Sequence, residues 1–227
     1  MTDCSVIRYA EINKGDRGLK MSPKIVDKEE KRKKIVAAAL KVFASKGYKG
    51  TRTIDIAEAA RIGKGTIYEY FRSKEELIEA IFERLFLDYE LRLEELAESY
   101  LTPVEAILAS FEQMMADADE YADLVPVYFE LWTAKDLNEK LGFDRQMSEW
   151  FEKFGSAYQD LIVKGQKRGE INPEIDAEAL GRTLVSAIDG IILHYCLFQP
   201  PKSFFKRQQK ELERMVRNVL DLGKKEG

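Results

Sequence analysis

The sequence has little of the chemistry that enzymes and metalloproteins use. It contains one histidine and two cysteines among 227 residues. No Cys/His cluster has metal-ligand spacing, and no Ser-His-Asp set can be assembled. Cys4 and Cys196 lie far apart in the chain and indicate no disulfide framework, which favours a reducing cytoplasm as the location. We therefore expect neither enzymatic activity nor a bound metal ion or cofactor.

Long apolar runs and β-strand patterns are also missing. No run approaches the ~20 apolar residues of a membrane span, and the start of the chain lacks the pattern of a signal peptide. No segment alternates apolar and polar residues over the length of a strand. The pattern predicts an all-α protein of about nine helices with no membrane partner.

The formal net charge of −4 conceals an uneven distribution. Residues 20–75 hold 15 lysines and arginines against 7 acidic residues, whereas residues 76–227 hold 18 against 30. A basic segment on an acidic body is typical of a DNA-binding domain joined to a regulatory one. The sequence predicts a tail of unknown structure at residues 1–20, a DNA-binding domain at 21–75, and an effector-binding and dimerisation domain at 76–227.

The segment Arg52–Lys74 has the pattern of two short helices joined by a tight turn. Apolar residues form one stripe on a helix over about Thr53–Ala60. A second helix is predicted over Lys64–Phe71, with Ile67 and Phe71 on its inner face. This spacing is that of a helix-turn-helix, whose second helix lies in the DNA major groove.

The stretch Gly63-Lys64-Gly65-Thr66 has a superficial likeness to a phosphate-binding loop. That loop requires G-x-x-x-x-G-K-[ST] after a strand. Here Lys64 is followed by glycine, and the preceding segment is a predicted helix. A nucleotide-binding loop is therefore excluded at this position.

From Lys33 to about Ile81 the chain resembles the DNA-binding domain of TetR-family transcriptional regulators. The matching stretches are, in order, IVAAALKVFASKGY, IAEAA, GKGTIYEYF and SKEEL. The resemblance implies a homodimer that binds a double-stranded DNA operator. It also implies a small-molecule effector that moves the helix after the DNA-binding domain and spreads the recognition helices. By family habit the regulator is expected to be a repressor.

Helix geometry and this resemblance together predict eight residues in contact with DNA. Tyr68, Tyr70 and Lys74 are expected to hold phosphates. Base edges are expected to be reached by Lys64, Thr66 and Arg52. The alternative for the tyrosines is packing in the small core of the domain. The full predicted set is Arg52, Thr53, Lys64, Gly65, Thr66, Tyr68, Tyr70 and Lys74.

Three positions depart from the family pattern. Arg52 stands where the family has a Ser or Thr helix cap, so Thr51 or Thr53 is expected to cap instead. Arg61 occupies the usual glycine of the turn; if this position keeps a positive φ, the arginine costs about 1 kcal/mol. Gly63 replaces the usual Ser cap of the recognition helix, a loss of roughly a few tenths of a kcal/mol.

Caps and breakers divide the rest of the chain into helices. Ser73 with Glu76, and Thr102 with Glu105, have the spacing of capping boxes. Gly47 is suited to end the first helix. The predicted helices cover approximately Lys24–Lys46, Ser73–Tyr100, Pro103–Ala118, Asp123–Lys140, Phe143–Arg168, Asn172–Phe198 and Ser203–Leu222.

Aromatic and methionine side chains are concentrated in three of the middle helices. Large rings and flexible methionines can line an adaptable apolar cavity, and they can equally fill a core. We expect an apolar or amphipathic effector among them. The predicted ligand-binding residues are Phe111, Met115, Tyr128, Phe129, Trp132, Trp150, Phe151, Phe154 and Tyr158.

The helix that ends at Phe198 carries more apolar residues than one buried face needs. Together with the final helix it predicts an isologous four-helix interface between two copies of the chain. The alternative is a fully intramolecular core. The predicted interface residues are Leu184, Ile188, Ile191, Tyr195, Leu212, Met215, Val216 and Val219.

These patterns predict a homodimeric, ligand-responsive DNA-binding regulator that its effector releases from a palindromic operator. The alternative is an architectural DNA-binding protein that needs no effector. A filled interior and an affinity indifferent to DNA sequence would favour that alternative.

Overall fold

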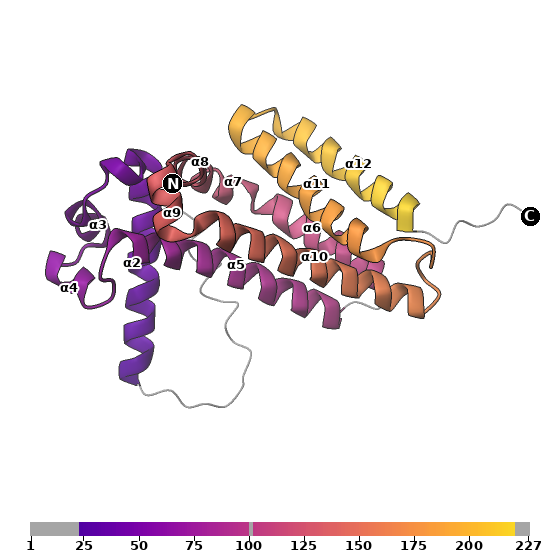
Figure 1. Cartoon of the computed structure of the whole chain (residues 1–227), viewed down its shortest axis with the longest axis horizontal. Coiled ribbons are helices and arrows are strands. Elements are labelled where there is room, and N and C mark those ends of the chain that lie inside the picture. The colour runs from indigo at the N-terminus through magenta and orange to yellow at the C-terminus, as the bar shows by residue number, and fades with distance from the viewer. Residues whose placement is uncertain (1–22, 100–101, 221–227) are drawn as a thin grey trace, which may run out of the picture. The chain divides into compact units, whose positions relative to one another are not determined.

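The computed structural model describes residues 23–99 and 102–220, which fold into helices with no strand among them (Figure 1). This confirms the all-α fold class. The predicted tail at residues 1–20 lies outside the described residues. The helices are α2 (Pro23–Gly50), α3 (Thr53–Ala60), α4 (Lys64–Tyr68), α5 (Lys74–Ser99), α6 (Pro103–Ala116), α7 (Ala118–Tyr121), α8 (Leu124–Thr133), α9 (Lys135–Leu141), α10 (Phe143–Lys167), α11 (Ala177–Phe198) and α12 (Lys202–Leu220).

The chain divides into two units between Lys34 and Ile35, so that α2 contributes to both. The second unit has two apolar cores. One combines α2 from Ile35 onward, α3 and α4 with the first half of α5, with α8 and α9, and with the start of α10. The other is formed mainly by α6, α10, α11 and α12, with Leu93 of α5 and Ala118 of α7. The helix-turn-helix therefore shares a core with α8 and α9.

Several helix boundaries lie where the sequence predicts them. Thr102 Oγ1 accepts a hydrogen bond from Glu105 N–H at 3.2 Å, and the Glu105 carboxylate accepts from Thr102 N–H at 3.3 Å. This is the predicted capping box. Gly47 leaves the helical conformation with φ 71°, which ends the long regular part of α2. At the start of α5, Ser73 Oγ accepts from Glu76 N–H at 3.2 Å.

Two predicted helices differ from the observed ones. The predicted helix Asp123–Lys140 is broken at Ala134, whose ψ of 88° separates α8 from α9. The break turns the chain so that Leu137, which is off the apolar stripe of α8, is buried. The helix expected to open at Asn172 begins instead at Ala177, because the Asp176 carboxylate accepts from Ala179 N–H and caps it there.

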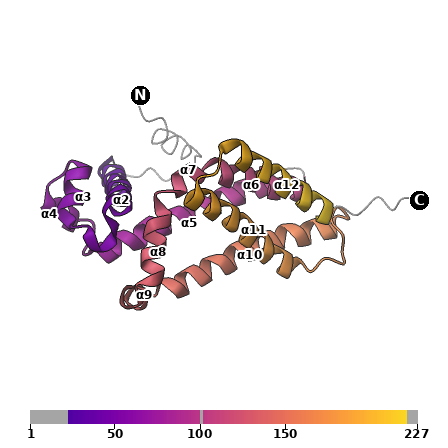
Figure 2. The ribbon, with the colours of Figure 1, turned by 90° about the horizontal axis from the view of Figure 1, so that it is seen from above.

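The helices α10 and α11 lie side by side in both views (Figures 1 and 2). Their backbones approach closely at Gly155 and Gly181. A Cβ atom added to Gly181 would lie 2.5 Å from the Gly155 carbonyl oxygen and 3.0 Å from the Gln159 amide nitrogen. Because both neighbours are backbone atoms, they cannot move aside as a side chain would.

Among the described residues, α11 alone has the length and composition of a membrane-spanning helix. Arg182 and Asp189 interrupt this helix, so the sequence shows no continuous apolar run here. Its side chains Leu184, Val185 and Ile188 are buried in the core that α11 shares with α10. Length and composition of one helix are weak grounds for a span.

We predict that Gly181→Ala lowers the free energy of unfolding by about 1–3 kcal/mol, because the added methyl group forces α10 and α11 apart. Urea unfolding followed by circular dichroism measures this change.

The matched control is Gly190→Ala on the same helix, where an added Cβ meets no atom within 4 Å. It should raise the free energy of unfolding by up to about 1 kcal/mol, since alanine is the better helix former. Equal effects of the two substitutions would contradict the close approach at Gly181.

Candidate functional site

The turn between α3 and α4 has the geometry of a helix-turn-helix. Arg61 adopts φ 56° and ψ 44°, the left-handed conformation that ends α3. Arg61 N–H donates to the Glu58 carbonyl at 3.1 Å, and Ile62 N–H donates to the Ala57 carbonyl at 3.0 Å. These bonds satisfy the last carbonyls of α3. Arg61 thus keeps the positive φ of the usual glycine, and Gly63 is the residue that precedes α4, as predicted.

The start of α3 is held by an acidic residue that sequence reasoning missed. Arg52, and not Thr51 or Thr53, occupies the cap position, and its N–H donates to the Asp55 carboxylate at 2.7 Å. Thr51 is buried and donates its hydroxyl to the Gly47 carbonyl at 2.7 Å, so it is not available as a cap. Lys46 Nζ lies 2.9 Å from Asp55, and this ammonium above all holds the pKa of Asp55 well below its ordinary range.

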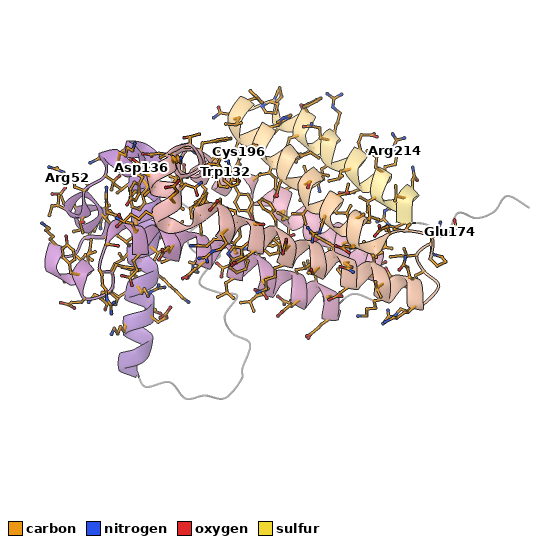
Figure 3. All side chains as sticks on the ribbon, in the orientation of Figure 1. Arg52, Trp132, Asp136, Glu174, Cys196 and Arg214 are labelled. Atoms are coloured by element: carbon orange, nitrogen blue, oxygen red, sulfur yellow. The ribbon has the colours of Figure 1, made fainter. Side chains whose placement is uncertain are left out.

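The second helix of the motif has the predicted buried face and an exposed face opposite it. Ile67 and the following Phe71 are buried, each 1% exposed. Lys64 and Gly65 are exposed, and the side chain of Tyr68 is half exposed. Residues 53, 66 and 70, which belong to the predicted set, are partly buried. Arg52 projects from the same part of the chain as α3 and α4, and is labelled in Figure 3.

Lys74 has a structural role that the sequence did not indicate. Its ammonium donates to the Tyr48 carbonyl at 2.9 Å and to the Thr51 carbonyl at 2.8 Å. It also lies over the Tyr48 ring, 4.5 Å from the centroid. Two of its three hydrogens are thus directed at the backbone where α2 turns into α3. We call this segment, residues 47–51, the α2–α3 corner.

The same corner is bound from α8. Tyr48 N–H donates to the Glu130 carboxylate at 2.6 Å, and Lys49 N–H donates to it at 3.0 Å. Hydrogen bonds to a charged partner contribute about 1.5–3 kcal/mol each. Glu130 and Lys74 therefore tie the corner to α8 and to the first turn of α5.

A further ion pair joins α5 to α9. Lys140 Nζ lies 2.7 Å from Glu75, and this hydrogen bond lowers the pKa of Glu75 to about 2. Because the pKa is lowered from 4.5, the pair stabilises the fold above that pH, and its contribution is lost as the pH falls towards 2.

A cavity of about 250 Å³ lies among α5, α6, α7, α8, α10 and α11. Nineteen residues line it, and eight of them are aromatic. Part of the wall is a stack of rings: Phe86 and Trp150 are 4.8 Å apart, and Trp150 and Phe154 are 5.9 Å apart, centroid to centroid. The volume is close to the lower end of the range for small-molecule sites.

The predicted ligand-binding residues fall into three groups. Tyr128, Trp150, Phe151 and Phe154 line the cavity. The others do not line it. Phe111, Met115 and Tyr158 are buried in the second core, and Phe129 and Trp132 are exposed on α8. Trp132 is labelled in Figure 3.

The buried hydroxyl of Tyr158 has hydrogen-bond partners. Its hydroxyl lies 2.6 Å from the Tyr89 hydroxyl and 2.9 Å from Ser110 Oγ. Burial raises the pKa of Tyr158 to about 12, so this network stays neutral at ordinary pH. Tyr158 is therefore a satisfied core tyrosine, the alternative that the sequence left open.

Cavity residues that sequence reasoning missed come mainly from α5 and α11. Phe82, Phe86 and Tyr89 repeat at helical spacing on α5 and line the cavity, but they lie outside the predicted ligand-binding set. Asp189 was missed on α11, although a lone carboxylate within an apolar stripe is a recognisable signal. Burial raises the pKa of Asp189 to about 7.

The predicted interface residues divide between interior and surface. Met215 and Val219 on α12 are 61% and 51% exposed, and Ile191 on α11 is partly exposed. The rest correct the prediction. They are buried within one chain and have almost no surface to offer a partner; they are Leu184, Ile188, Tyr195, Leu212 and Val216.

The sequence matches two family models, one after the other along the chain. The model described as bacterial regulatory proteins of the tetR family matches residues 35–81. The model described as the tetracyclin repressor-like C-terminal domain matches residues 104–218, just over half of the chain. The first match covers the helix-turn-helix, and the second covers the helices from α6 to α12.

Individual proteins agree with these matches. The HTH-type transcriptional regulator YfiR of Bacillus subtilis is 26% identical over 208 residues, which cover 90% of this chain and 100% of YfiR. The HTH-type transcriptional repressor DhaR of Mycobacterium sp. (strain GP1) is 26% identical over 164 residues, covering 71% of this chain and 80% of DhaR.

Among solved structures, the transcriptional regulator FadR of Bacillus subtilis, in complex with stearoyl-CoA, shares the fold with a TM-score of 0.66. At 21% identity, the similarity covers 81% of this chain and 96% of the FadR chain.

The left-handed conformation of Arg61 gives a prediction about stability. We expect Arg61→Gly to raise the free energy of unfolding by about 1 kcal/mol, because glycine adopts φ 56° without steric cost. Urea unfolding at neutral pH measures the change.

Arg61→Ala is the control, since it removes the guanidinium and keeps the Cβ atom. It should give no such gain. A gain of equal size in both variants would mean that the charge of Arg61, and not its backbone, is what destabilises the turn.

Proposed function

Because the chain belongs to the TetR family of bacterial transcriptional regulators, we propose that it is a homodimeric repressor that a small apolar or amphipathic effector releases from a palindromic operator. Regulators of this family bind DNA in the cytoplasm, typically respond to small molecules and are generally not enzymes. The observation that carries the proposal is that α5 and α8 both line the cavity and both hold the α2–α3 corner.

The proposed DNA contact is made by the exposed side of α4 and its flanks. Lys64 and Gly65 stand at the first turn of α4, where exposed amide groups and a positive charge favour a nearby phosphate or base edge. Tyr68 offers a half-exposed hydroxyl to a phosphate. The two hydrogen bonds of Lys74 to the corner leave one hydrogen of its ammonium for a phosphate, so its main contribution is to position the motif.

The proposed dimer uses the outer sides of α11 and α12. On α12, residues 205, 212, 216 and 220 are buried, whereas Phe204, Met215 and Val219 occupy the adjacent side and are 43–61% exposed. A helix with apolar residues on two adjacent sides has one side left for a partner. Two copies that meet there would present two recognition helices to successive major grooves.

The proposed response to an effector follows from the two helices that join the cavity to the corner. Phe82, Phe86 and Tyr89 of α5 and Tyr128 of α8 are parts of the cavity wall. The first turn of α5 and Glu130 of α8 hold the corner that precedes α3. A ligand that displaces either wall also displaces the anchor of the helix-turn-helix, so occupancy and DNA affinity are coupled.

A fold neighbour supports an amphipathic effector. FadR of Bacillus subtilis has been crystallised with stearoyl-CoA, a molecule with a long apolar chain. The apolar and aromatic wall of the present cavity is suited to an apolar body.

We expect selection of bound DNA from a random pool to yield a palindrome with half-sites about one helical turn apart. On that DNA, Lys64→Ala should weaken binding by about 10- to 100-fold and relax the preference at one position of each half-site, because a base contact is lost. Fluorescence anisotropy at several salt concentrations measures both effects.

Two variants serve as comparisons for Lys64→Ala. Tyr68→Phe removes a phosphate contact and should weaken binding to all sequences alike. Lys206→Ala removes an exposed lysine of α12 and should change nothing. A uniform loss with Lys64→Ala would contradict its contact with bases, and a pool that yields no enriched sequence would favour the architectural alternative.

We predict that Met215→Glu and Val219→Glu, introduced together, convert a dimer into a monomer of 26.1 kDa, because buried carboxylates at an apolar interface are costly. Sedimentation velocity measures the mass. Leu91→Glu on α5, where leucine is likewise 51% exposed, should leave the dimer intact. An unchanged mass for the α12 variant would place the interface elsewhere.

A further inference from the structure

The cavity contains one charged side chain in an otherwise uncharged wall. Asp189 is the only acidic or basic residue among the nineteen that line it. It lies on α11 next to Ile188, in the middle of the helix. Among the described residues, none donates a hydrogen bond to its carboxylate or forms an ion pair with it. A carboxylate without a partner in an apolar site is costly, and a positive charge nearby offsets the cost.

The rest of the wall also favours a positive charge. Eight aromatic residues line the cavity, and the faces of aromatic rings attract cations. No lysine or arginine lines the cavity to neutralise Asp189 or to bind an anionic headgroup. An anion would therefore meet a like charge among apolar side chains, and a neutral ligand would leave the carboxylate unpaired.

We propose that the cavity binds an organic cation, with a protonated amine against Asp189 and an apolar or aromatic body against the rings of α5 and α10. This inference rests on the proposed function only in taking the bound molecule to be the effector. It names the chemical class that the cavity selects, which the aromatic wall alone does not.

The ionisation of Asp189 gives the proposal a pH dependence. Burial raises the pKa of this carboxyl to about 7. The titratable groups facing it from the packed helices are Tyr89 of α5, Tyr128 of α8 and Tyr158 of α10, together with Tyr121 of α7 in the cavity wall. Burial raises the pKa of Tyr89, Tyr128 and Tyr158, so they stay neutral from pH 6 to 8. Cation affinity should thus rise about tenfold over that range as Asp189 ionises.

Three probes with one body and different headgroups test the proposal on the full-length protein. They are 4-phenylbutylamine, 4-phenylbutanol and 4-phenylbutyrate, which are cationic, neutral and anionic at pH 8. Calorimetric titration should show the amine binding at least about tenfold more tightly than the alcohol, and the carboxylate most weakly. In a Trp132→Phe variant the quenching of Trp150, which lines the cavity, reports the same binding optically.

Asp189→Asn keeps the shape of the side chain and removes its charge. It should make the affinities for the amine and the alcohol equal, change the alcohol affinity less than about twofold, and abolish the rise with pH. Asp160→Asn, on the exposed side of α10, should leave the preference for the amine unchanged. Should the asparagine variant lose its fold, the pH dependence of the native protein still decides.

The proposal is overturned if the native protein does not bind the amine, if it binds the three probes equally, or if it prefers the alcohol or the carboxylate. It is also overturned if the preference survives in Asp189→Asn. DNA affinity is measured separately with and without each probe. Asp189-dependent amine binding that leaves DNA affinity unchanged would sustain the ligand class and contradict the effector role. Release of DNA by the alcohol alone would contradict the ligand class and sustain a small-molecule effector.

Discussion

The α2–α3 corner is held by opposite charges acting on opposite ends of its peptide groups. The Glu130 carboxylate accepts from the N–H groups of Tyr48 and Lys49, and the Lys74 ammonium donates to the carbonyls of Tyr48 and Thr51. A helix end and the loop after it present such groups without partners, and charged side chains satisfy them strongly. Because Glu130 lies on α8 and Lys74 on α5, the position of the helix-turn-helix is set by two helices that also form the cavity.

The aromatic wall of the cavity and the DNA-binding motif are connected through one packed core. The rings of Phe82 and Phe143 are 5.1 Å apart in an edge-to-face contact, and both belong to the core that includes α3 and α4. Phe82 also lines the cavity. Packed interiors deform little and tend to switch between discrete arrangements. In the proposed mechanism, a ligand among these rings would therefore act on the same core that supports α4.

Local patterns in the sequence predicted local structure well. The turn at Arg61, the caps at Thr102 and Ser73, and the end of the regular part of α2 at Gly47 each depend on a few neighbouring residues. Such features are decided by backbone conformation and short-range hydrogen bonds, which composition and spacing express directly. The break at Ala134 had no such signal, because it depends on where Leu137 can be buried.

Whether a residue lines the cavity or lies on the surface depends on packing between distant segments. A single sequence does not reveal that packing. Trp132 and Tyr158 have similar aromatic character, yet one is 45% exposed and the other fully buried. Phe86, which was not predicted, forms the wall because it faces Trp150 from another helix. The burial of Leu184 and Ile188 against α10 likewise required the close approach at Gly181. Periodicity identified these helices as apolar but could not assign their sides to core, cavity or partner.

An effector changes DNA affinity only through the difference between its affinities for the two conformations. The position of Asp189 on α11 is informative in this respect, because α11 supplies no contact to the α2–α3 corner among the described hydrogen bonds. In the proposed complex, the ion pair would hold the headgroup on a helix that does not bear on the motif. The body of the ligand would then press on α5 and α8, which do. Affinity would come mainly from the contact with α11, and discrimination between the two conformations would come from the contacts with α5 and α8. A coupling of about 1–3 kcal/mol, the usual range for allosteric proteins, requires only that the rings of α5 and α8 fit the ligand better in the released conformation.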